Sequence, residues 1–244
     1  FDEHVLRLYS SLMFFGYKKI SLEIFKSKLK KDVEELIKAK DLNGENANLK
    51  IIVSRGTYKK RLDFSSGAKS ETIIFADKFD GYNPDYYGKG VDIIIASIKR
   101  VPYHNCIYRH KMLNYFENVF AKNEALLKGA FESLFATVEG LVLEGSISNI
   151  FMTKEKTVYT PSLDFNILPG ITRKKVLDIC MENNIKTVEC KLSLDDFYNA
   201  DEIFLTNSLA EIMPVKKIKN FTPREDVPGE LTKKILNIYR NHYR

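Results

Sequence analysis

This sequence of 244 residues lacks the features that mark several classes of protein. Its three cysteines, Cys106, Cys180 and Cys190, are too few and too scattered for a disulfide framework or a zinc cluster. We interpret them as reduced thiols in or near the core, and we expect no metal site. No apolar run reaches the ~18 residues that a membrane-spanning helix needs. No internal repeat or low-complexity segment stands out.

The basic residues of the chain do not form one aromatic-rich stripe. The net charge is +6, but lysines and arginines alternate with acids along the whole length. Since a nucleic-acid-binding protein tends to collect basic and aromatic residues in one stripe, we expect no nucleic-acid partner. A basic protein does suit an anionic cofactor and an anionic substrate. With 44% hydrophobic residues, the composition predicts a packed globule, which we expect in the cytoplasm.

Periodicity and turn signals predict alternating helices and strands. In the first part we expect helices over 5–13 and 22–40, the second capped by Ser21, strands over 49–53, 72–76 and 91–98, and a polar loop over 80–90. The segment 100–108 breaks the pattern. We therefore predict an α/β (α+β) protein with a small domain over 1–104 and a larger one over 105–244. The chain has no initial methionine and opens inside an amphipathic pattern, so we expect the small domain to lack its first residues.

Two residues carry the chemistry that the sequence indicates. Lys111 stands before a predicted helix, and Glu144 follows the apolar run 141–143, with Gly145 and Ser146 next to it. Taken alone, each is an ordinary surface residue. An acid at the end of a buried strand, however, is stable only if it meets a cation. A protonated pyridine ring is such a cation, and a lysine near it forms the Schiff base of a pyridoxal phosphate enzyme.

A cofactor phosphate also needs a binding site, and two segments could supply it. The segment 169–173, Pro-Gly-Ile-Thr-Arg, opens a helix whose first N–H groups face an anion favourably. The run Thr206, Asn207 and Ser208 follows an apolar strand, where ligands of α/β proteins gather. A plain helix cap at Thr172 and an ordinary turn at 206–208 are the alternatives. Arg7, on the first helix, reads as a surface arginine by itself.

These motifs, in this order, resemble the class IV aminotransferase family, whose fold is type IV. The resemblance lies in 111–115 with 121–125, in 144–151 (Glu-Gly-Ser-Ile-Ser-Asn-Ile-Phe), in 160–161, in 167–173 and in 206–208 with 214–215. The opening segment 4–8 is similar to the N-terminal helix of that family. The resemblance covers essentially the whole chain. It implies a two-domain fold like that of D-amino acid aminotransferase, pyridoxal 5'-phosphate as cofactor, and a homodimer.

The resemblance also implies a role for each matching residue. Lys111 would be the Schiff-base lysine and the acid–base group, and Glu144 would pair with the pyridine nitrogen. Tyr115 would reach the ring hydroxyl of the cofactor. The phosphate ligands would be Arg7, Ile171 through its backbone N–H, Thr172 and Thr206.

The sequence leaves two reactions open. Arg55 after the first expected strand and the basic loop that contains Arg61 favour binding of a dicarboxylate substrate. Asn207, a third expected substrate contact, belongs to the run 206–209, which resembles lyases. We therefore predict 4-amino-4-deoxychorismate lyase, an enzyme of folate biosynthesis. The alternative is an amino acid aminotransferase, for branched-chain or D-amino acids, that uses 2-oxoglutarate. In both cases the substrate is a small anion that carries an amine.

Overall fold

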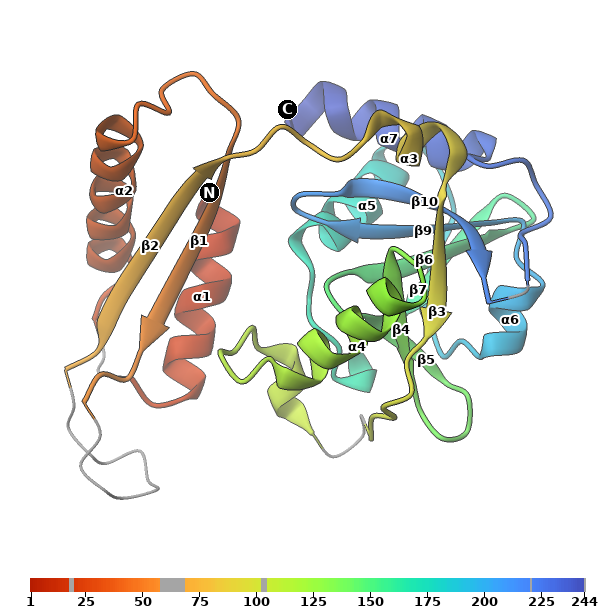
Figure 1. The fold of residues 1–244 in the computed structure, drawn as a ribbon, viewed down its shortest axis with the longest axis horizontal. Coiled ribbons are helices and arrows are strands. Elements are labelled where there is room, and N and C mark those ends of the chain that lie inside the picture. Colours follow the sequence, from red (N-terminus) through yellow and green to blue (C-terminus); the bar gives the residue numbers. More distant parts are fainter. Residues whose placement is uncertain (18–19, 58–68, 102–104, 220, 244) are drawn as a thin grey trace. The chain divides into compact units, whose positions relative to one another are not determined.

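A computed structural model of the chain describes residues 1–17, 20–57, 69–101, 105–219 and 221–243 (Figure 1). The chain divides into two compact units, Phe1–Gly81 and Tyr82–Arg244. The division lies ahead of the boundary expected between residues 104 and 105. The physical reason is β3, Val91–Ile95, which pairs in parallel with two strands of the second unit.

The first unit packs two helices against a strand pair. Its elements are α1 (Asp2–Phe14), α2 (Leu22–Ala39), β1 (Ala47–Ser54) and β2 (Glu71–Lys78). The side chain of Ser21 caps α2 by accepting the N–H of Ile24, as the sequence predicted. The strands β1 and β2 are antiparallel. Val5, Leu29 and Ala76 are the most buried apolar residues of this unit and come from three of its elements.

The second unit is built on one curled sheet. Among the described residues the sheet has eight strands in the order β5-β4-β3-β10-β9-β6-β7-β8. The strands after β3 are β4 (Glu132–Ala136), β5 (Val142–Gly145), β6 (Asn149–Lys154), β7 (Thr157–Pro161), β8 (Thr187–Cys190), β9 (Glu202–Asn207) and β10 (Glu211–Ile218). The N–H of Val142 in the first edge strand donates to the carbonyl of Leu192, just after the last strand, at 2.8 Å. The sheet therefore closes back on itself.

Helices and short turns surround this sheet. They are α3 (Pro84–Lys89), α4 (Phe116–Leu127), α5 (Ile171–Glu182), α6 (Leu194–Tyr198), α7 (Glu230–Tyr243) and the 3-10 turns η2 (Cys106–Arg109) and η3 (Leu163–Phe165). Helices α5 and α7 lie side by side in Figure 1 and share an apolar cluster with the sheet. No described helix is long and apolar enough to cross a membrane.

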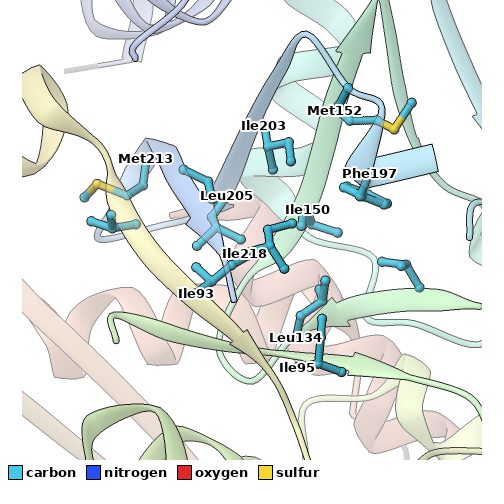
Figure 2. Packing of buried hydrophobic residues seen from close by; sticks show 14 of the residues in the cluster. Ile93, Ile95, Leu134, Ile150, Met152, Phe197, Ile203, Leu205, Met213 and Ile218 are labelled. Atoms are coloured by element: carbon cyan, nitrogen blue, oxygen red, sulfur yellow. The ribbon is translucent and has the colours of Figure 1, made fainter. Parts of the chain in front are cut away.

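The main core lies inside the curl of the sheet. Figure 2 shows side chains from β3, β4, β6, β9 and β10 pointing toward one another there, including Ile93, Leu134, Ile150 and Leu205. Alternation along a strand explains this arrangement, because Ile150 and Met152 face this cluster while Phe151 between them faces α5 and α7. The curled sheet holds the ends of β5 and β9 and the start of α5 in place, and polar residues lie at these three points.

Two details of the expected secondary structure need correction. The glycines of segment 80–90 favour a loop, but the segment contains α3, which begins with Asn83 as its cap and Pro84 at its first position. The strand expected over 91–98 ends at Ile95. Both errors concern local elements and leave the mixed α/β class as predicted.

Candidate active site

The carboxylate of Glu144 is buried at the end of β5. Only 6% of the residue is exposed. Its Oε1 accepts a hydrogen bond from Nη1 of Arg100 at 2.9 Å, and its Oε2 accepts the N–H of Leu168 at 3.0 Å. Burial raises the pKa of Glu144 to about 7, although Arg100, the Leu168 N–H and the charge of Lys111 all lower it. Because a carboxylate has about four acceptor positions, Glu144 can accept a further bond from a cation.

Arg100 is the cation that Glu144 meets within the chain itself. Its side chain is 3% exposed. The guanidinium donates through Nε to Glu117 at 3.2 Å and through Nη2 to Oδ1 of Asn118 at 2.9 Å. Its carbon lies 3.5 Å from the centroid of the Phe135 ring. Three hydrogen-bonded partners around its edge and an aromatic ring on its face hold the guanidinium in place. These contacts compensate for the cost of removing the ion pair from water.

A second buried carboxylate shapes the turn that follows Glu144. Glu132, fully buried on β4, accepts hydrogen bonds from the hydroxyls of Ser146 and Ser148 and from the N–H of Ile147. A Cβ on Gly145 would lie 2.2 Å from Oγ of Ser148 and 3.0 Å from Oε2 of Glu132. Only glycine fits there, so the turn is packed directly onto the Glu132 side chain.

Lys111 is connected by hydrogen bonds to the turn that follows Glu144. Lys111 is exposed and lies four residues before Tyr115, the N-cap residue of α4. Its Nζ donates to Oη of Tyr115 at 3.2 Å, and Oη donates to the carbonyl of Ser146 at 3.4 Å. The charge of Lys111 also lowers the pKa of Glu144, so the two groups interact electrostatically.

The start of α5 and the end of β9 form a second polar group. Gly170 precedes Ile171, and the cap supplies no side chain to accept the first N–H groups of the helix. Thr172 is buried, and the buried hydroxyl of Thr206 has no hydrogen-bond partner among the described residues. Asn149 pairs with Thr206 in the sheet. A Cβ on Gly170 would lie 1.9 Å from Oδ1 of Asn149, so Asn149 touches both segments.

These contacts locate the predicted residues of the second unit. Lys111, Tyr115 and Glu144 share one network. Oη of Tyr115, expected at the ring hydroxyl of a cofactor, is in contact with Lys111. Oδ1 of Asn207 accepts the N–H groups of Leu209 and Ala210 and thereby holds the turn after β9, so its contact with substrate stays a prediction.

The remaining predicted residues lie elsewhere in the chain. Arg7 and Arg55 belong to the first unit. Nη1 of Arg55 donates to the carbonyl of Phe15 at 2.6 Å, and its guanidinium lies 4.9 Å from the centroid of the Tyr17 ring. Arg61 and the rest of its basic loop lie outside the described residues. The roles of Arg7 in phosphate binding and of Arg55 and Arg61 in substrate binding stay predictions.

Sequence reasoning missed three residues of this network: Arg100, Asn118 and Glu132. Arg100 stands in a segment that looked like a plain connection between domains. The requirement that a buried acid meets a cation could have pointed to it, because it is a lone arginine after an apolar strand. Asn118 and Glu132 carry no local signal, since their partners lie on other elements.

The model of the family Amino-transferase class IV matches residues 1–218. The chain belongs to the class IV aminotransferase family. Three curated relatives span nearly all of it. D-alanine aminotransferase of Bacillus licheniformis is 34% identical, covering 98% of this chain and 81% of the relative. Aminodeoxychorismate lyase of Bacillus subtilis is 28% identical (98% and 79%), and branched-chain-amino-acid aminotransferase of Escherichia coli K12 is 27% identical (97% and 76%).

Solved structures of class IV aminotransferases have the same fold. The branched-chain enzyme of Escherichia coli superimposes with a TM-score of 0.89 at 25% identity, covering 99% of this chain and 79% of that one. The enzyme of Thermoproteus uzoniensis, solved with norvaline, gives 0.85 at 29% identity (98% and 77%). The enzyme of Thermobaculum terrenum, solved in its PLP-form, gives 0.79 at 24% identity (98% and 76%). The expected fold-type IV is confirmed.

Pyridoxal 5'-phosphate is the cofactor that membership of the class IV aminotransferase family implies, and the described residues fit it. The unpartnered hydroxyl of Thr206 and the first N–H groups of α5 suit a phosphate. Glu144 can accept one more hydrogen bond from a ring nitrogen, and Lys111 supplies an amine in the same network. The described residues therefore include groups that suit the phosphate, the ring nitrogen and the aldehyde of the cofactor.

Proposed function

We propose that this enzyme uses pyridoxal 5'-phosphate to act at the amine-bearing carbon of a small anionic substrate. The proposal rests on one hydrogen-bond network that contains an exposed lysine, Lys111, and a buried carboxylate, Glu144. In the same unit, the buried hydroxyl of Thr206 has no hydrogen-bond partner among the described residues. The bound cofactor supplies an electron sink for the charge that forms when the carbon loses its proton.

The side chains divide this work between them. Lys111 anchors the cofactor and carries a proton between its Nζ and the reacting carbon, with Oη of Tyr115 at 3.2 Å to orient it. Glu144 keeps a proton on the ring nitrogen, held for this purpose by Arg100 and the N–H of Leu168. The N–H groups of Ile171 and Thr172 and the hydroxyl of Thr206 bind the phosphate.

Transamination of an amino acid is the finer reaction that we now place first. D-alanine aminotransferase, at 34% identity, is more similar to the chain than the lyase of Bacillus subtilis, at 28%. Arg55 is also less available to a dicarboxylate substrate, because its guanidinium contacts Phe15 and Tyr17 inside the first unit.

Cleavage of 4-amino-4-deoxychorismate to pyruvate and 4-aminobenzoate is the second candidate. The run Thr206-Asn207-Ser208 resembles lyases, and Asn207 holds its turn through two hydrogen bonds to the backbone. In that geometry the neighbouring hydroxyls have fixed positions at the end of β9.

One comparison of products separates the two reactions. Purified enzyme is incubated with L- and D-amino acids plus 2-oxoglutarate and, separately, with 4-amino-4-deoxychorismate alone. Keto acid that forms only with 2-oxoglutarate supports transamination, whereas pyruvate and 4-aminobenzoate without any acceptor support the lyase. A purified protein that takes up no cofactor and stays colourless contradicts the proposal as a whole.

We further propose that the enzyme works as a homodimer in the cytoplasm. Helix α4 carries exposed apolar side chains at helical spacing, among them Phe116 (73%), Val119 (58%) and Leu127 (80%). An exposed apolar stripe of this kind is typical of a contact surface between proteins. Its partner in this proposal is a second copy of the chain.

A further inference from the structure

Asn118 lies between the two halves of the candidate site. It stands on α4, one turn after Tyr115. Its Nδ2 donates to the carbonyl oxygen of Ser146 at 2.6 Å, and its Oδ1 accepts from Nη2 of Arg100 at 2.9 Å. Both partners define the orientation of the amide, because a guanidinium only donates and a carbonyl only accepts. Asparagine is the residue type that satisfies both at once without adding charge.

The bonds of Asn118 complete a continuous path between Glu144 and Lys111. Arg100 connects Asn118 to Oε1 of Glu144. On the other side, the carbonyl of Ser146 also accepts from Oη of Tyr115, which in turn accepts from Nζ of Lys111. The whole path lies within the second unit.

The far end of this path does not move freely, because Ser146 is itself anchored. Its hydroxyl donates to the buried carboxylate of Glu132, which also accepts the N–H of Ile147. Asn118 therefore joins Arg100 to a rigid turn. Glu117, the neighbouring partner of Arg100, cannot do the same, since 44% of its side chain is exposed and its bonds lead to Arg100 and Tyr108.

We propose that Asn118 is a positioning residue that sets the distance and the charge coupling between Lys111 and Glu144. Its effect on turnover rests on the proposed function, whereas its effect on Glu144 does not. Without the amide, Arg100 keeps its bond to Glu117 and is free to turn away from Glu144. With an aspartate instead, a half-buried carboxylate shares the guanidinium with Glu144 and repels the carbonyl of Ser146.

The charged groups around Glu144 make the sign of the effect predictable. Arg100 after β3 and Lys111 before α4 favour its ionised form. Glu117 on α4 competes for the same guanidinium, and Glu132 on β4 packs against the turn beside it. A new carboxylate at position 118 adds to the acids, so it disfavours the ionised form of Glu144.

The test compares Asn118→Ala and Asn118→Asp with Asn123→Ala, a matched control on the same helix where asparagine is exposed. In the holoenzyme we measure kcat, KM and the pH midpoint of the cofactor absorbance band. We expect both variants to lower kcat roughly ten- to hundredfold with little change in KM. The midpoint should move by about half a pH unit or more, in Asn118→Asp further than in Asn118→Ala. The control should match wild type.

The cofactor-free chain gives a readout that does not depend on the proposed function. The melting temperature is followed against pH for each protein, with and without Glu144→Gln, and the difference reports the titration of Glu144. The proposal predicts a higher midpoint in Asn118→Asp than in wild type. If the variants only melt earlier, with the Glu144 midpoint, the cofactor midpoint and kcat unchanged, Asn118 is merely structural and the proposal is overturned. If wild type binds no cofactor but the Glu144 midpoint still moves, the proposed function fails while the positioning of Glu144 stands.

Discussion

A buried carboxylate requires compensation, and Glu144 receives it from the chain before any ligand binds. Arg100 and the N–H of Leu168 occupy one position on each oxygen. Burial nevertheless dominates and raises the pKa of Glu144 to about 7. A ring cation would add the missing favourable charge, so ionisation of Glu144 and binding of the cofactor should support each other.

The raised pKa of Glu144 predicts how the stability of the cofactor-free enzyme depends on pH. The fold favours the neutral carboxyl, so its stabilising contribution is present below the ordinary value of 4.5 and is lost as pH rises through about 7. Wild type should lose up to about 3 kcal/mol relative to Glu144→Gln between pH 5 and 8. Unfolding by urea at each pH measures this. A wild type that gains stability over this range would mean that Arg100 outweighs burial.

Lys111 should be the residue that holds the cofactor. Lys111→Ala should abolish the absorbance band of the linked cofactor and lower turnover by at least about three orders of magnitude, because both the covalent anchor and the proton carrier are lost. Lys174→Ala, at an exposed lysine that pairs with Asp178, is the control and should be unchanged. Spectra and single-turnover rates are the measurements. Full activity in Lys111→Ala would contradict the assignment of the whole site.

The three cysteines should differ in reactivity because their surroundings differ. Burial raises the pKa of Cys180 to about 12, and it also raises that of Cys190, whereas Cys106 is exposed. Since the thiolate is the reactive form, iodoacetamide at about pH 8 should label Cys106 first and Cys180 only after unfolding. Mass spectrometry of digests taken over time measures the order. Early labelling of Cys180 would show that its helix opens readily.

At the scale of elements, the loop before α5 depends on one glycine. A Cβ at Gly170 would meet Oδ1 of Asn149 at 1.9 Å, and this side chain also donates to the carbonyl of Leu168. Gly170→Ala should therefore displace the start of α5 and weaken cofactor binding roughly tenfold or more, with a loss of about 1–3 kcal/mol in stability.

Gly88 offers the matched control for that substitution. It lies inside α3, and a Cβ there meets nothing within 4 Å. Gly88→Ala should leave cofactor binding unchanged and raise stability by roughly 0.5 kcal/mol, because alanine suits a helix better. Fluorescence titration with pyridoxal 5'-phosphate and thermal unfolding measure both variants. Equal affinity in the two would show that the loop has room for a methyl group.

The elements also show what the sequence could predict and why. Strong periodicity predicted α2, and the Ser21 cap marked its start. Helix α3 was missed because Gly81, Gly88 and Gly90 outweighed the start signals of Asn83 and Pro84. The bridge formed by Asn118 was beyond reach for another reason. Its partners lie on separate elements, and only the packed fold brings their atoms together.

At the scale of the whole molecule, nonlocal pairing decides where the chain divides. The break at 100–108 suggested a boundary near residue 105, but β3 joins the sheet of the second unit between β4 and β10. The segment alone does not reveal which strands it pairs with, because β4 and β10 lie far from it in the sequence. The carboxyl end of β3 leads to Arg100, so this assignment to the second unit is also what places the guanidinium beside Glu144.

The exposed stripe on α4 predicts the oligomeric state. Wild type should sediment with twice the mass of one chain, because burying Phe116, Val119 and Leu127 against a second copy removes apolar surface from water. The double variant Phe116→Lys/Leu127→Lys places two charges in that contact and should shift the protein to monomer at micromolar concentration.

Ile24→Lys, at an exposed position of α2, is the control and should stay dimeric. Sedimentation velocity over a range of concentrations measures this, and a double variant that still dimerises would move the contact to another surface. If the site needs the second copy, activity should fall in parallel with the dimer fraction; if each chain works alone, the monomeric variant should keep its turnover.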